Sequence, residues 1–123
     1  MNIDKVRSLE GIEGAEEFNV PLQFLCTNTC VVTNTSYMFK NASAFNSYLY
    51  IDTTNVSNMR HMFYNARKFN RDISNWNYQK AASNMKYFLY GATAFSKENY
   101  CKLKAISVLK YVDLGLTPPF SCK

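Results

Sequence analysis

The sequence of 123 residues has no apolar run that approaches the roughly 18 to 20 residues of a membrane-spanning helix. It has only four glycines and three prolines, which speaks against a collagen-like or low-complexity chain. Its opening segment, MNIDKVRSLE, lacks the basic start and the apolar stretch of a signal peptide. If the protein is exported, we expect its leader to be missing from this chain.

Groups suited to catalysis are scarce. His61 is the only histidine, so a metal cluster or a catalytic triad could draw on one imidazole at most, and we expect it on the solvent-exposed face of a helix. No Gly-rich phosphate loop, G-x-S-x-G or H-E-x-x-H motif occurs. Glu16 and Glu17 are adjacent and project in different directions, which leaves no carboxylate pair for acid–base catalysis. The sequence predicts no catalytic residue, metal or cofactor.

The composition favours one folded domain with an uneven charge. Hydrophobic residues make up 47% of the chain and aromatic residues 15%, so we expect one core within a single domain over residues 1–123. Residues 1–59 hold three basic and six acidic side chains, whereas residues 60–123 hold eleven basic and three acidic ones. This asymmetry favours an anionic partner near the C-terminal half, unless the charge only keeps the protein soluble.

The chain contains an internal repeat. The segments NTSYMFKNASAFN, NMRHMFYNARKFN and NMKYFLYGATAFS begin at residues 34, 58 and 84 and align without a gap. Phe45, Phe69 and Phe95 are 24 and 26 residues apart, and each follows an alanine by three residues. A weaker copy, GAEEFN, occupies residues 14–19. Most of the chain is therefore predicted to consist of repeats of about 25 residues.

Each copy has the pattern of a short helix followed by a strand. In the second copy, apolar residues follow the i, i+3, i+4, i+7 spacing of one helical face from Met59 to Ala66. Asparagine precedes this run, and asparagine or glycine ends it, which are residue types that cap helices. Ile73 and Trp76 in the segment DISNW then suit a short strand.

Such a unit cannot bury its own apolar side, so neighbouring units are expected to stack. The predicted fold is α/β, a short leucine-rich-repeat-like solenoid of about four helix–turn–strand repeats. Residues 1–33 are assigned to an N-terminal cap and degenerate repeat, residues 34–98 to three clear repeats, and residues 99–123 to a C-terminal cap and tail, with a capping helix over residues 99–116. The predicted repeat core consists of Met38, Phe39, Ala42, Phe45, Met59, Met62, Phe63, Ala66, Phe69, Ile73, Trp76, Met85, Phe88, Leu89, Ala92 and Phe95.

The second copy resembles the repeat of the BspA-like leucine-rich-repeat surface proteins, which is also found in mycoplasma lipoproteins. That pattern runs approximately N-M-x-x-M-F-x-x-A-x-x-F-N-x-D-[IL]-S-x-W-[DN], and NMRHMFYNARKFNRDISNWN (residues 58–77) satisfies it almost throughout. The resemblance covers residues 34–96 well and residues 8–33 weakly, and residues 97–123 lie outside it. The first clear copy lacks the Asp and the Trp, and the third lacks the strand half. The resemblance implies a solenoid for surface attachment or protein–protein contact, and no catalytic residue.

Four cysteines, Cys26, Cys30, Cys101 and Cys122, allow three interpretations. Cys26 with Cys30, and Cys101 with Cys122, could form disulfides in an oxidising compartment. All four could instead be free thiols in a reducing cell. A zinc site is the third interpretation, which the lack of paired C-x2-C spacing disfavours.

The sequence leaves the compartment open. Sequons at Asn34, Asn41 and Asn55 permit glycosylation if the protein is exported, yet the same asparagines suit cap and turn positions of the repeat. Disulfides would favour an oxidising or particle-associated setting, such as a virion, an organelle lumen or the extracellular space.

Two sets of side chains are candidates for an interface. The first set is basic, and Lys40, Lys86 and Lys97 could extend it. It suits an acidic protein surface or a polyanion, and it is not part of any known nucleic-acid-binding motif. The aligned tyrosines either form outward ladders, which offer contact area at low entropy cost, or cover the seams between helices. The candidate interface residues are Arg60, Arg67, Lys68, Arg71, Tyr37, Tyr64, Tyr87 and Tyr90.

These features together predict a non-enzymatic module that acts through its surface. The first hypothesis is a small scaffold or adaptor subunit of a larger viral or organellar assembly, which contacts other proteins of that complex and has no membrane span and no small-molecule substrate. The small number of copies favours it, because surface adhesins of the family are long and anchored. A secreted or cell-surface adhesion or ligand-binding domain is the alternative. A polyanion or nucleic-acid binder acting through the basic C-terminal half is the third hypothesis.

Overall fold

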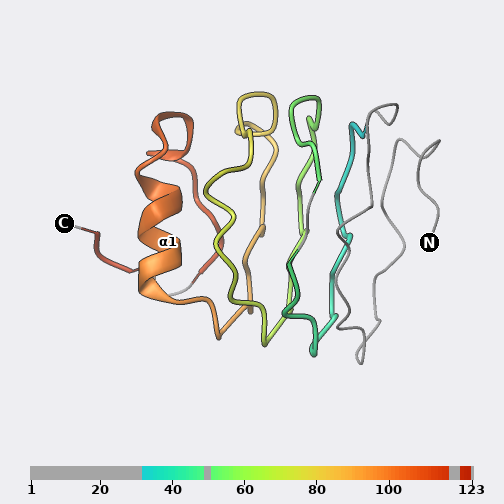
Figure 1. Ribbon diagram of the computed structural model, residues 1–123, viewed down its shortest axis with the longest axis vertical. Coiled ribbons are helices and arrows are strands. Elements are labelled where there is room, and N and C mark those ends of the chain that lie inside the picture. Colours follow the sequence, from blue (N-terminus) through green and yellow to red (C-terminus); the bar gives the residue numbers. More distant parts are fainter. Residues whose placement is uncertain (1–31, 49–50, 117–119, 123) are drawn as a thin grey trace.

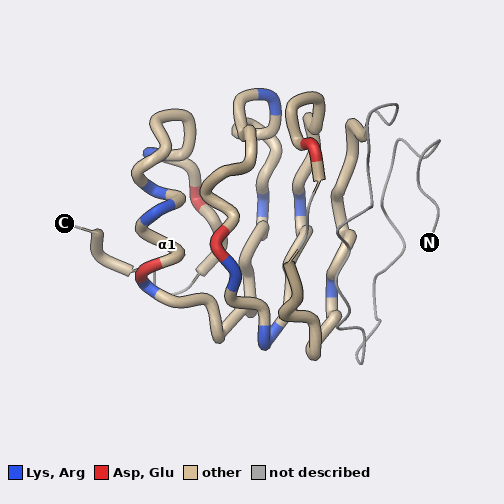
Figure 2. Tube along the Cα trace, viewed as in Figure 1, with Lys and Arg blue, Asp and Glu red and all other residues tan. Residues whose placement is uncertain are grey.

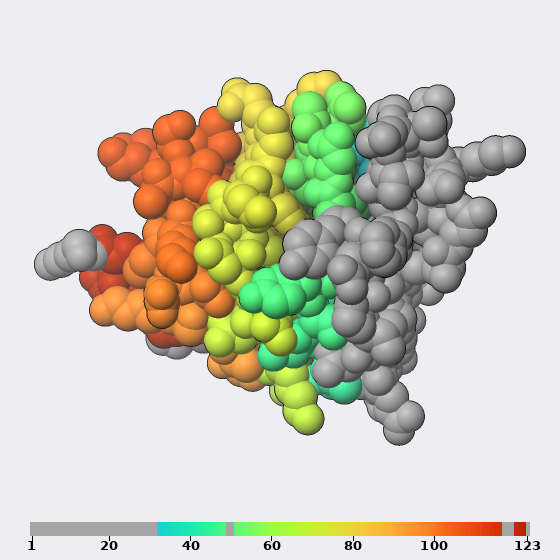
Figure 3. Space-filling view, viewed as in Figure 1, coloured from blue at the N-terminus to red at the C-terminus, as the bar shows by residue number. Residues whose placement is uncertain are grey.

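The computed structural model describes residues 32–48, 51–116 and 120–122 of the chain. The predictions for residues 1–31, which include the degenerate repeat and the possible Cys26–Cys30 disulfide, lie outside these ranges. In the described part, the chain winds through successive coils that lie side by side (Figure 1). These coils form bands that follow one another in sequence order across the surface in view (Figure 3).

The predicted α/β solenoid of helix–turn–strand repeats is wrong. Within the described ranges the structure has one α-helix, α1 (Lys97–Lys104), one 3-10 helix, η1 (Ser107–Leu109), and no β-strand. The nearest feature to a strand in these ranges is an isolated parallel bridge between Asn34 and Asn58. The repeat segments consist of consecutive turns in place of the predicted helices and strands.

Turns replace the predicted helices because the backbone becomes left-handed at regular intervals. The N–H of Met38 donates to the carbonyl of Thr35, three residues earlier, at 3.2 Å. Tyr37, the third residue of this turn, has φ +61°, as a type II turn requires at that position. The equivalent residues His61 and Tyr87 have φ +57° and +58°. Since an α-helix needs negative φ at every residue, none can run through these positions.

Backbone hydrogen bonds join neighbouring coils at a regular register. The N–H of Tyr37 donates to the carbonyl of Arg60 at 3.0 Å, and the N–H of Phe39 donates to the carbonyl of Met62 at 2.8 Å. Alternate residues therefore bond across to the next coil, which fixes the register. The same pattern joins the next two coils, with bonds from His61 to Lys86 (2.9 Å), from Phe63 to Phe88 (2.9 Å) and from Asn65 to Tyr90 (2.7 Å).

The asparagines expected to cap helices form a different structure. Oδ1 of Asn34 accepts the N–H of Ser36 at 2.8 Å, and Oδ1 of Asn58 accepts the N–H of Arg60 at 3.0 Å. These are Asx turns, in which the side chain bonds the backbone two residues further on. Such a bond stabilises a turn in competition with a helix, which is a second reason why no helix forms here.

All the side chains assigned to the repeat core are buried, and their phenyl rings form columns. Phe39 stacks on Phe63 with 5.8 Å between ring centroids, and Phe63 meets Phe88 edge to face at 5.3 Å. Each aromatic pair contributes about 0.5–1.5 kcal/mol beyond the burial of its area. The second column consists of Phe45, Phe69 and Phe95, with 5.8 and 5.9 Å between successive centroids.

The DISNW segment is buried without being a strand. Ile73 and Trp76 lie in the core, and the N–H of Trp76 donates to the carbonyl of Ile73 at 3.3 Å, which closes a turn. Oδ1 of Asp72 accepts both the N–H (2.9 Å) and the hydroxyl (2.6 Å) of Ser74, so the segment bends. Tyr78, which the sequence did not assign to the core, buries its ring nearby and donates its hydroxyl to the carbonyl of Ile73 at 2.7 Å.

The C-terminal helix is shorter than the predicted residues 99–116. α1 begins after Ser96, whose hydroxyl accepts the N–H of Asn99 at 3.1 Å, and it ends at Lys104. Ile106 has an extended backbone, with φ −75° and ψ 125°, which separates α1 from η1. The apolar spacing that suggested one long helix is therefore divided among α1, η1 and an extended segment.

The segment after η1 covers the last coil. The N–H of Leu89 donates to the carbonyl of Leu114 at 2.7 Å, and Leu103, Leu109 and Leu114 are buried. α1 and this segment therefore close the C-terminal end of the described coils (Figure 1). Neither helix of the described part has the length or apolar character needed to cross a bilayer.

Gly91 occupies the left-handed position that Asn41 and Asn65 hold in the preceding coils. Their φ values are +77°, +63° and +58° respectively. Nδ2 of Asn65 donates to Oδ1 of Asn41 at 3.2 Å. A Cβ at Gly91 would overlap Oδ1 of Asn65. The three equivalent positions therefore have room for two asparagine side chains and a glycine.

Gly91→Ala is expected to lower the free energy of unfolding by about 1–3 kcal/mol through left-handed strain, and further through overlap with Asn65. In an Asn65→Gly background the same substitution should cost less, because its overlapping partner is gone. Urea unfolding followed by the fluorescence of Trp76 measures both costs, with Thr93→Ala as an exposed control. Equal costs in the two backgrounds would contradict the packing described for Gly91.

Candidate functional site

Aromatic rings from three neighbouring coils lie in contact. Tyr37 stacks on His61 with 4.8 Å between centroids, and Tyr87 contacts His61 edge to face at 5.1 Å. Tyr64 stacks on Tyr90 at 4.9 Å. The two columns touch each other, because His61 lies 5.3 Å from Tyr64 and Tyr87 lies 5.4 Å from Tyr90.

Two lysines contact these rings. Nζ of Lys40 lies 5.5 Å from the ring centroids of both Tyr37 and Tyr64, and Nζ of Lys86 lies 5.1 Å from that of Tyr87. Such cation–π contacts contribute about 0.5–1 kcal/mol each at exposed sites. The aromatic–basic face is defined here as Tyr37, His61, Tyr64, Tyr87 and Tyr90 together with Lys40, Arg60 and Lys86.

Two of the cations of this face form no ion pair in the described part of the chain. Arg60 and Lys86 are exposed, and neither forms an ion pair within the described residues. Arg60 and Lys86 occupy equivalent positions on neighbouring coils. The residue after Arg60 is His61, and its N–H donates to the carbonyl of Lys86. Basic residues accordingly recur on neighbouring coils in Figure 2. The face presents positive charge beside aromatic rings.

A hollow of about 400 Å³ lies at one end of the face. Lys86, Tyr87 and Tyr90 line it from the last coil, and Asp113 and Gly115 line it from the segment that covers that coil. Tyr87 and Tyr90 are each 41% exposed, whereas Tyr37 and Tyr64 are half-buried. The tyrosines thus both cover the seams between coils and present surface, the two alternatives that the sequence left open.

The remaining basic candidates do not belong to the aromatic–basic face. Nε of Arg71 donates to the carbonyl of Asn46 at 2.9 Å, and its guanidinium lies 4.6 Å from the ring centroid of Tyr48. Arg71 therefore joins two coils away from the aromatic columns. Arg67 and Lys68 are exposed at the turn before Phe69, and Lys97 lies on α1.

His61 is half-buried, in contrast to its expected place on the exposed face of a helix. Its Nδ1 atom is buried and has no hydrogen-bond partner among the described residues. Burial lowers the pKa of His61, and the positive charges of Lys40, Arg60 and Lys86 lower it further. Both effects on the pKa favour the neutral form of the imidazole within the ring column. Its alignment with Tyr37 and Tyr87 was the sequence signal that could have assigned it to this face.

Both cysteines in the described part of the chain are paired with each other. Cys101 on α1 and Cys122 in the tail form a disulfide, with 5.5 Å between their Cα atoms, which is one of the pairings considered from the sequence. The asparagines of the described sequons are engaged within the protein, since Asn55 accepts a hydrogen bond from Lys80 at 2.9 Å. Within the described ranges no group of His, Cys, Asp and Glu side chains could hold a metal ion.

The chain belongs to the family described as "Mycoplasma protein of unknown function, DUF285", which matches residues 1–102. This family is found in BspA-like surface proteins, so the resemblance seen in the sequence holds at the level of this family. The matched range includes all the described coils and most of α1, and it excludes η1 and the tail. No curated protein and no solved structure matches the chain.

The pH dependence of stability tests the environment of His61. A histidine has a pKa of about 6.5 in a peptide, so a lowered value in the folded state means that the unfolded state binds more protons below that pH. The contribution of His61 to the free energy of unfolding should be complete above about pH 6.5, and it should be lost as the pH falls through the folded pKa of His61. His61→Gln should remove it, as measured by urea unfolding between about pH 5 and 8.

Proton NMR titration of the His61 imidazole provides the direct readout. We expect a midpoint below the peptide value, whereas a midpoint at or above it would contradict the packing described here. The carboxyl groups of Asp52 and Asp72 titrate outside this window, because hydrogen bonds from Thr54 and Ser74 lower their pKa values.

Proposed function

We propose that this protein is a non-enzymatic module that binds another protein through its aromatic–basic face. The observation that carries the proposal is a contiguous set of aromatic rings beside Arg60 and Lys86, two cations that form no ion pair within the described residues. Tyrosine and arginine are over-represented among the residues that dominate binding energy at protein interfaces. An acidic surface with apolar groups would complement both features of this face.

The arrangement of the rings supports binding at low entropy cost. Tyr87 and Tyr90 are each 41% exposed, yet each contacts the other and a ring of the preceding coil. Side chains already held by their neighbours lose little further freedom when a partner covers them, so ordering opposes association less. Lys86 and Asp113 at the hollow could add polar contacts that select the partner.

The partner is proposed to be a fixed neighbour in a larger assembly, in which this chain is a scaffold or adaptor subunit. α1 and the segment after η1 cover the end of the described coils, so contact with a neighbour would use the sides of the coils. The aromatic–basic face lies along such a side, because its residues come from three successive coils. The face is long enough for one partner to contact all three coils.

A second candidate function is attachment at a cell surface, as a BspA-like surface protein. Membership of a family found in such proteins supports it. The disulfide between Cys101 and Cys122 supports it as well, because disulfides persist in oxidising environments outside the cell. The same face would then bind an external protein.

Removing the two cations tests the proposal. The protein is isolated gently from its source without reduction, and the material is separated by size-exclusion chromatography and identified by mass spectrometry. Wild type should elute in a large particle with reproducible neighbours, and Arg60→Gln with Lys86→Gln should weaken that association about tenfold. The matched control, Arg67→Gln with Lys68→Gln, removes the same charge from an exposed turn and should leave the particle intact.

Three results would overturn parts of this proposal. Equal retention of the neighbours by the test and control variants would exclude the aromatic–basic face as the contact surface. Recovery of the wild type as a lone monomer would exclude the assembly role and favour the surface candidate. Binding to heparin that falls steeply with salt, without protein neighbours, would indicate a polyanion binder.

A further inference from the structure

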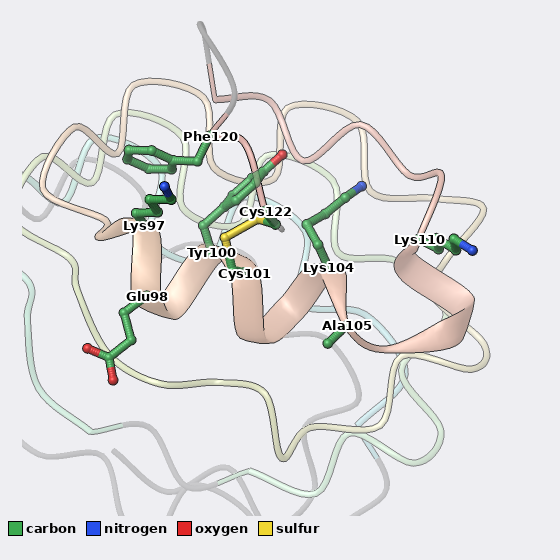
Figure 4. Close-up of a pocket in the computed structure, with 9 residues that line it drawn as sticks. All are labelled: Lys97, Glu98, Tyr100, Cys101, Lys104, Ala105, Lys110, Phe120 and Cys122. Carbon is green, nitrogen blue, oxygen red and sulfur yellow. A yellow bond between two sulfur atoms is a disulfide. The ribbon is translucent and has the colours of Figure 1, made fainter.

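A second surface, independent of the aromatic–basic face, lies at the C-terminal end. α1 and the tail enclose a groove of about 800 Å³ (Figure 4). Its apolar wall is made by Tyr100 and Phe120, whose rings meet at 5.5 Å, and the Cys101–Cys122 disulfide lies beside them. This volume is within the range of pockets that hold ligands in proteins.

The rim of the groove is basic. Lys97, Lys104 and Lys110 line it, against a single acidic residue, Glu98. The ammonium of Lys104 already donates to the carbonyls of residues 109 (3.0 Å) and 112 (2.6 Å), whereas Lys97 and Lys110 form no ion pair within the described residues. Glu98 pairs with Lys102 at 3.6 Å, and its carboxylate points away from Phe120, while the ammonium of Lys97 lies beside that ring (Figure 4).

The tail supplies unpaired backbone groups. The N–H and C=O groups of residues 120–122 form no hydrogen bond within the described part of the chain. The disulfide nevertheless ties this segment to α1. A short segment that is held in place with free donors and acceptors matches what an added peptide strand requires. Because the segment is tethered before binding, its ordering would oppose association less.

We propose that this groove binds a short acidic peptide segment of a partner protein, in an extended conformation. The peptide backbone pairs with residues 120–122, a large apolar side chain of the peptide packs against Tyr100 and Phe120, and its carboxylates face Lys97 and Lys110. Free backbone groups on the tail favour a peptide over a free amphiphile, which has no backbone to pair. The charge of the rim favours an acidic peptide over a basic one.

The test is an NMR titration of the isotope-labelled, oxidised protein with the peptide acetyl-Glu-Asp-Phe-Asp-Glu-amide. The amide signals of residues 120–122 should shift in a saturable manner. Lys97→Gln with Lys110→Gln should raise the dissociation constant about fivefold, and Phe120→Ala about threefold. Cys101→Ser with Cys122→Ser should raise it about tenfold, because the tail is no longer held against α1.

Matched controls separate this groove from other sites. Lys68→Gln, on an exposed turn, should leave the dissociation constant unchanged. Arg60→Gln with Lys86→Gln should also leave it unchanged, so this proposal and the one for the aromatic–basic face can fail separately. Circular dichroism checks that each variant remains folded.

Three outcomes would overturn the proposal. The first is the absence of saturable shifts in residues 120–122. The second is an affinity for acetyl-Lys-Lys-Phe-Lys-Lys-amide equal to that for the acidic peptide. The third is binding of laurate, an anionic amphiphile without a backbone, that shifts the same signals while the acidic peptide does not.

Discussion

The regularly spaced backbone hydrogen bonds between neighbouring coils are the constraint on which the rest of the structure depends. The bonds from Tyr37 to Arg60 and from His61 to Lys86 occur where the donor residue is left-handed. A left-handed residue other than glycine costs about 1–3 kcal/mol. Bonds across the coils, each contributing about 0.5–1.5 kcal/mol, and stacked phenyl rings in the core offset this cost. The register they fix aligns like side chains in columns.

The candidate binding surface follows from this constraint. The left-handed residues Tyr37, His61 and Tyr87 carry the first ring column on the outer side of the coils, while phenyl rings form columns on the inner side. Stacking within the outer column stabilises residues whose backbone is strained. Arg60 and Lys86 precede left-handed residues in equivalent turns, so their charges recur at the same place in successive coils. Stability and the proposed binding role therefore depend on the same positions.

The repeat itself could be predicted from the sequence, because burial and register both recur with the spacing of Phe45, Phe69 and Phe95. The local backbone could not. The turns are closed by hydrogen bonds between residues three apart, and they bury apolar side chains at gaps of three and four. This spacing is the same as that of one face of a helix. Positive φ is rare at tyrosine, and histidine, although enriched there, indicates it far less strongly than glycine does. A disulfide in the tail was one of three interpretations that the cysteines left open, and the groove beside it depends on contacts between α1 and Phe120 that no motif encodes.

The most direct test of the coil-to-coil register is the detection of scalar couplings across hydrogen bonds by NMR. The structure predicts a coupling from the amide nitrogen of His61 to the carbonyl carbon of Lys86, and another from Phe63 to Phe88. A coupling from the amide nitrogen of Phe63 to the carbonyl carbon of Met59 would contradict it, because that bond, four residues back, belongs to an α-helix.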